Sequence, residues 1–167
     1  MTETLDLGLL ALRLVLALLL LGHAAQKLLG WFRGAGLAGS GELFETLGFR
    51  PGRPMVVMAA LSETAAATLL ALGLLTPVGG AIAIGTMIVA AAANFSKGLW
   101  AHLGGYEVAF VYACLAAVLV LTGSGEISLD HALDLTYDTW VPWVALAVGV
   151  LAAVPVLVRR ALQRTPR

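Results

Sequence analysis

The sequence predicts an all-α membrane protein, with a compact four-helix transmembrane bundle and a fifth, C-terminal transmembrane helix. Hydrophobic residues make up 60% of the 167 residues and charged residues 12%, about half the charged fraction of soluble domains. The apolar residues also fall into blocks of about twenty, the length at which a helix crosses a bilayer. Most of these blocks have no polar face, which a core helix of a soluble protein would show.

Five apolar blocks follow one another along the chain. They cover residues 7–29, 54–75, 77–93, 106–121 and 141–158. Pro142 and Pro155 in the last block allow a kink or a shallow insertion. We therefore expect a four-helix membrane domain at residues 1–133, followed at 134–167 by a fifth helix and a basic cytoplasmic tail.

Two connections have distinct sequence patterns. Thr76 alone separates the second block from the third, and it suits an N-cap followed by Pro77 at the first helical position, so we expect a tight hairpin. The loop at 30–53 is rich in glycine and contains a stretch near 40–48 whose apolar side chains share one face: Leu43, Phe44 and Leu47. This stretch predicts a helix at the membrane surface, and a loop that only packs is the alternative.

The charges alternate between the two sides of the predicted bundle. Basic residues gather on one side: Lys27, Arg33, Arg50, Arg53 and Lys97, with Arg159, Arg160, Arg164 and Arg167 joining them if the fifth block spans. Acidic residues gather on the other: Glu3, Asp6, Glu126, Asp130, Asp134 and Asp138. The positive-inside rule then places the N-terminus outside the cell membrane and the C-terminus in the cytoplasm.

Several polar side chains lie within the apolar blocks, where an Arg, Lys or Asp costs about 2.5–3.5 kcal/mol on insertion scales. The candidates for a buried cluster or ligand site are Arg13, His23, Gln26, Lys27, Glu63, Asn94 and Glu107. From depth along the helices, we expect Glu63 to pair with Arg13 and His23. Structural roles are the alternative, because buried pairs also specify helix packing and Lys27 can reach the headgroups.

Several motifs together resemble the DoxX family of membrane proteins. They are Leu12-Arg13-Leu14, Gly22-His23, Gln26-Lys27-Leu28, Trp31-Phe32, the glycine-rich 34–39, Phe44-Glu-Thr-Leu-Gly48, Glu63, 72–76 and Gly104-Gly-Tyr-Glu107. They extend over roughly residues 7–133. The family is similar to the DoxD subunit of thiosulfate:quinone oxidoreductase, so the resemblance implies a component of a redox or sulfur-metabolism system near the quinone pool.

Three functions remain open at this point. The first is a subunit of a quinone-linked oxidoreductase, in which His23, Lys27 and Glu107 hydrogen-bond a quinone. The second is a small transporter or proton-coupled permease, and the third is a non-catalytic scaffold. No catalytic residue is assigned. We expect no covalent cofactor, no metal site and no nucleic-acid partner; the expected partners are the lipid bilayer, a redox protein and a second copy of the chain.

Overall fold

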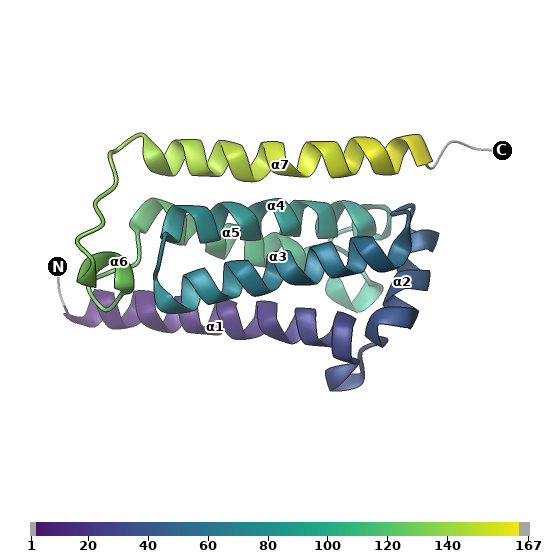
Figure 1. Cartoon of the computed structure of the whole chain (residues 1–167), viewed down its shortest axis with the longest axis horizontal. Coiled ribbons are helices and arrows are strands. Elements are labelled where there is room, and N and C mark those ends of the chain that lie inside the picture. The colour runs from purple at the N-terminus through teal and green to yellow at the C-terminus, as the bar shows by residue number, and fades with distance from the viewer. Residues whose placement is uncertain (1–2, 164–167) are drawn as a thin grey trace.

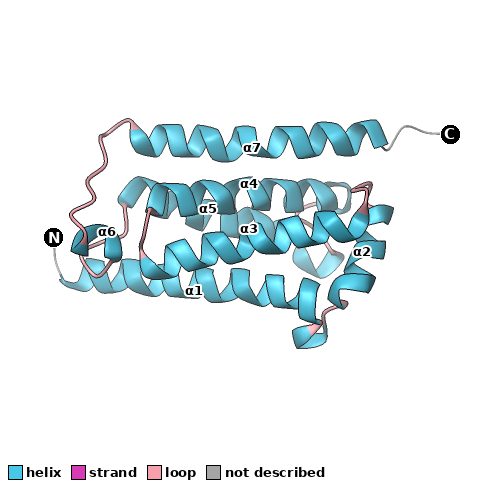
Figure 2. Cartoon of the chain, in the orientation of Figure 1, coloured by secondary structure: helices cyan, strands magenta, loops and turns pink. Residues whose placement is uncertain are grey.

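The computed structural model describes residues 3–163, and this part of the chain is helical without a strand (Figure 2). The α-helices are α1 (Glu3–Leu29), α2 (Gly36–Thr46), α3 (Gly52–Leu72), α4 (Thr76–Asn94), α5 (Glu107–Thr122), α6 (Leu129–Ala132) and α7 (Val141–Gln163). Short 3-10 helices connect them: η1 (Trp31–Arg33), η2 (Phe95–Lys97) and η3 (Ala101–Leu103). The predicted all-α fold is confirmed.

Four of the described helices are long and apolar enough to cross a membrane, namely α1, α3, α4 and α7. The C-terminal block is among them, because α7 continues through Pro155 for 23 residues. The shorter apolar helix is instead α5, with 16 residues. All five predicted blocks therefore form helices, and the helix of marginal length is the fourth block rather than the fifth.

The apolar helices α1, α3, α4, α5 and α7 lie side by side, with α2 across one end of the bundle and α6 at the other end (Figure 1). Their core is formed by α1, α3, α4 and α5, whose fully buried side chains include Leu16, Leu20, Leu70 and Leu119. Helix α7 packs along α4, and most of its large apolar side chains remain exposed. Exposed apolar side chains on a bundle of this kind are suited to contact with lipid.

Small residues let α4 contact three neighbouring helices. A Cβ added to Gly79 would meet Leu69 of α3, and one added to Gly80 would meet Val120 of α5. On a third face, a Cβ added to Gly85 would lie 2.9 Å from the carbonyl oxygen of Gly149 in α7. These glycines therefore bring α3, α5 and α7 close to α4, as packing between membrane helices favours.

The predicted N-cap at Thr76 is wrong. Helix α4 begins at Thr76, and Leu75 before it has the left-handed backbone conformation with φ 46°. The first N–H groups of a helix lack partners within it and need an outside acceptor. Asp130 of α6 supplies that acceptor, since its Oδ1 accepts from Leu75 N at 2.7 Å and its Oδ2 from Thr76 N at 3.0 Å.

Candidate functional site

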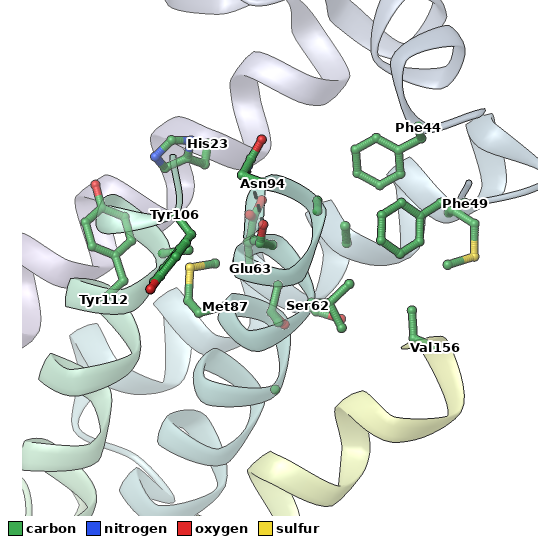
Figure 3. Close-up of a pocket in the computed structure, with 18 of the residues that line it drawn as sticks. His23, Phe44, Phe49, Ser62, Glu63, Met87, Asn94, Tyr106, Tyr112 and Val156 are labelled. Carbon is green, nitrogen blue, oxygen red and sulfur yellow. Dashed lines mark hydrogen bonds between the residues drawn. The ribbon is translucent and has the colours of Figure 1, made fainter. Parts of the chain in front are cut away.

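A cavity of about 550 Å³ lies at the α2 end of the bundle, among α1, α2, α3, α4, α5 and α7. Its wall is mostly apolar, with a few polar side chains grouped around Glu63 (Figure 3). This size and composition are typical of sites for small molecules and cofactors, which measure about 300–1,000 Å³. The predicted α2 helix contributes Leu43 and Phe44 to the wall, so the apolar face expected at 40–48 borders the cavity.

An ion pair between α1 and α3 forms part of the wall. Lys27 Nζ lies 2.5 Å from Glu63 Oε1 and 2.7 Å from Oε2. The Glu63 side chain is 3% exposed and the Lys27 side chain 21%. Both carboxylate oxygens therefore share one ammonium group whose remaining surface borders the cavity.

The predicted partners of Glu63, Arg13 and His23, are wrong. Helices α1 and α3 are antiparallel neighbours, so the C-terminal end of α1 lies beside the first half of α3 (Figure 1). Arg13 precedes Lys27 by fourteen residues, about 21 Å of helix, and its guanidinium lies instead against Gly73 at the other end of α3. The expected pairing assumed that the depth of each residue in the membrane follows from its position along its own helix. It failed because α1 and α3 are offset along their axes, which brings Lys27 rather than Arg13 to the level of Glu63.

Aromatic and amide groups complete the polar part of the cavity. His23 packs edge-on against Tyr112 of α5, with ring centroids 5.7 Å apart. Asn94, Lys97 and Tyr106 line the same space. Imidazole, amide, ammonium and phenol groups are hydrogen-bond donors of the kind that a ligand carbonyl accepts.

Three of the seven candidates lie outside this cavity wall: Arg13, Gln26 and Glu107. Glu107 Oε2 accepts from the backbone N of Ala101 at 2.8 Å, so it orders the connection between η3 and α5. The backbone of Gln26 packs closely against Gly34 at the start of the loop to α2. Cys114, the single cysteine of the sequence, is exposed on α5. Tyr106 and Tyr112, which sequence reasoning missed, were detectable as aromatic hydroxyls in or beside an apolar block.

Arg13 belongs to a second polar cluster, at the α6 end of the bundle. It is fully buried and donates to the carbonyl oxygen of Ile127, while its Nε and Nη1 have no hydrogen-bond partner among the described residues. Asp130, 3% exposed, accepts from the Tyr137 hydroxyl at 2.9 Å. Partial burial, this hydrogen bond and the negative charge of Asp130 raise the pKa of Tyr137 to about 12. Asp130, which the sequence placed among the acidic residues of one side of the bundle, is therefore buried against it.

Arg160, predicted to lie in the basic tail that follows the fifth helix, lies within α7 instead. It is buried, donates from Nε to the carbonyl oxygen of Leu47 at 2.9 Å and from Nη1 to that of Ala92 at 2.6 Å, and lies over the Phe49 ring. Arg159 beside it is exposed, whereas Arg164 and Arg167 lie outside the described residues. Over residues 3–163, no group of three or more His, Cys, Asp and Glu side chains converges as a metal site would require.

The fold and the cavity define a multi-pass helical membrane protein. The chain matches the DoxX family over residues 8–103, more than half of its length, and therefore belongs to the DoxX family. The match includes α1 to η3 and ends before α5, so it extends less far than the resemblance we noted in the sequence. Neither the curated proteins nor the solved structures contain a match.

Proposed function

We propose that this DoxX protein binds the head group of a quinone in the α2-end cavity and serves as a membrane component of a redox system. The observation that carries the proposal is the Lys27–Glu63 ion pair in the wall of an apolar cavity. A quinone site needs an apolar slot and hydrogen-bond donors for two carbonyl oxygens. The cavity offers the slot, and Lys27, His23 and Tyr112 offer the donors.

Charge in the membrane favours a functional role for this pair. Ionisable residues within spans are costly, and they mark ligand sites and proton pathways more often than other membrane positions do. A pair that served packing alone would be enclosed by apolar side chains on every side. Lys27 instead keeps 21% of its side-chain surface free beside the cavity.

Electrons must reach the quinone from a second protein. The sequence contains a single cysteine, so the chain alone cannot form the dithiol of a disulfide exchange. We therefore propose a redox partner protein that carries a thiol or another electron donor. We also propose a cell-membrane location with the N-terminus outside and the C-terminus in the cytoplasm. This orientation follows if the chain crosses the membrane five times and its basic side faces the cytoplasm.

The proposal is tested by thermal unfolding of the purified protein with and without a short-chain quinone. A ligand that binds only the folded state at about 100 times its Kd adds about 2.7 kcal/mol to stability. We expect this stabilisation in the wild type and its loss in Glu63→Gln and Lys27→Gln. Tyr137→Phe, in the distant α6-end cluster, is the matched control and should keep it.

Other outcomes would replace the proposal. If quinone leaves the unfolding of the wild type unchanged, the site does not bind it. Movement of a solute across liposomes without any electron donor would then support a transporter. Copurification with partner proteins, without either activity, would support a scaffold.

A further inference from the structure

The cavity has a polar side and an apolar side (Figure 3). His23, Tyr106, Tyr112 and Asn94 lie on the polar side, near Glu63. The apolar side extends toward α2 and α7, and its wall includes Phe44, Phe49, Met58, Ala59, Val89 and Val156. The apolar side extends beyond the hydrogen-bond donors that would hold a quinone head group, so its extent needs a separate explanation.

Helix α7 bridges the apolar side and is fixed on both sides of it. In its middle, a Cβ added to Gly149 would lie 2.9 Å from the carbonyl oxygen of Ala81, which shows how closely α7 approaches α4. Near its C-terminal end, α7 contacts the loop between α2 and α3 twice. Gln163 Nε2 donates to the carbonyl oxygen of Arg50 at 3.2 Å, and Arg160 lies over the ring of Phe49. Between these contacts, α7 presents only Ala152 and Val156 to the cavity.

The apolar side opens sideways, through the surface of the bundle. Met58 of α3 and Leu43 of α2 line the cavity while remaining 44% and 54% exposed. Ala152, on the facing helix, is also exposed. Because α3 and α7 are both long and apolar enough to cross a membrane, an opening between them faces the hydrocarbon region.

We infer that this apolar side is the channel for the isoprenoid tail of a membrane quinone, which enters and leaves between α3 and α7. The inference rests on the proposed function, since it assigns the rest of the same ligand. A lateral opening lets the head group reach Lys27 and Glu63 while the tail never leaves an apolar environment. Lipid tails are as apolar as the channel wall, so the fit of the tail depends on space rather than on hydrophobic gain.

The experiment compares two quinones that share a head group in nanodiscs of one lipid composition. One carries a single isoprene unit and the other a long isoprenoid tail. Val156→Trp narrows the channel from α7, and Met58→Trp narrows it from α3. Leu151→Trp, which adds the same ring to an exposed position of α7 outside the cavity wall, is the matched control.

We expect each channel variant to bind the short quinone as the wild type does and to lose affinity for the long one by at least about tenfold, a difference of 1.4 kcal/mol. The control variant should bind both as the wild type does. If the channel variants bind the long quinone normally, or lose both quinones equally, the tail channel is wrong and the head-group site stands. If the wild type binds neither quinone, both the channel and the proposed function are wrong.

Discussion

Removal of Lys27 should leave a buried carboxylate without a partner. Glu63 is 3% exposed, and Lys27 Nζ contacts both of its carboxylate oxygens. Breaking a buried ion pair by removing one partner costs about 3–5 kcal/mol, whereas replacing both partners with apolar residues is often neutral or stabilising. Because the surface of Lys27 borders the cavity, we expect Lys27→Met to lower the free energy of unfolding by about 3 kcal/mol, at the lower end of this range.

The assay is reversible unfolding in mixed detergent micelles, with Lys27→Met, Glu63→Leu and the double variant compared at one pH. The double variant should recover most of the stability that Lys27→Met loses, since it carries no unpaired charge. It should nevertheless bind no quinone, which separates the function of the pair from its contribution to stability. A Lys27→Met variant within 0.5 kcal/mol of the wild type, or a double variant less stable than either single one, would refute this reasoning; differences below about 0.5 kcal/mol are typical of ordinary surface changes.

Three further predictions concern the fold around the site. Asp130→Ala removes the acceptor for the first N–H groups of α4 and should cost about 2 kcal/mol in thermal unfolding; an unchanged melting temperature would contradict the cap. The raised pKa of Tyr137 means that its neutral form is favoured in the folded state, so its contribution to stability is complete below pH 10 and is lost as the pH rises through about 12. The difference in phenolate absorbance between the wild type and Tyr137→Phe should therefore titrate near pH 12, and a midpoint near 10 would count against the Asp130 contact. Gly149→Ala should cost about 1–3 kcal/mol by forcing α7 away from α4, whereas Gly8→Ala, with open space around it, should not destabilise the protein; equal effects of the two would be evidence against the close approach.

The helices were predictable because long apolar blocks leave few alternatives. In a bilayer every backbone polar group must be satisfied within the segment, so an apolar block of sufficient length becomes a helix. The extent of α7 was harder to predict, because Pro155 suggested an interruption that the helix does not make. Membrane helices accommodate proline when neighbouring groups satisfy the backbone.

The candidate site was predicted as a set of residues but not as a geometry. His23, Lys27, Glu63 and Asn94 do line one cavity, because the energetic cost of a polar side chain in an apolar block is visible in the sequence. Their pairing was not visible, since it depends on how far α1 and α3 are displaced along their axes. The assignment of Arg13 to the same cluster failed for this reason.

The roles of Asp130 and Arg160 were hidden for a different reason. Each residue stabilises a segment distant in the chain: Asp130 caps the N-terminus of α4, and Arg160 bonds to carbonyl oxygens of Leu47 and Ala92. In the sequence, Asp130 is one of several acidic residues spaced along a loop and Arg160 is one of several arginines near the end of the last apolar block, so neither stands out from its neighbours. Only the folded chain shows that each satisfies buried backbone groups.

The most direct test of the central claim is photolabelling with a quinone that carries an azide on its ring, followed by mapping of the modified peptides. The account predicts adducts in α3 and α4 at the residues that line the cavity, such as Ser62 and Met87, and competition by unlabelled quinone. It also predicts that Glu63→Gln removes this labelling. Adducts confined to the exposed face of α7, unchanged by competitor or by Glu63→Gln, would contradict a quinone site beside the Lys27–Glu63 pair.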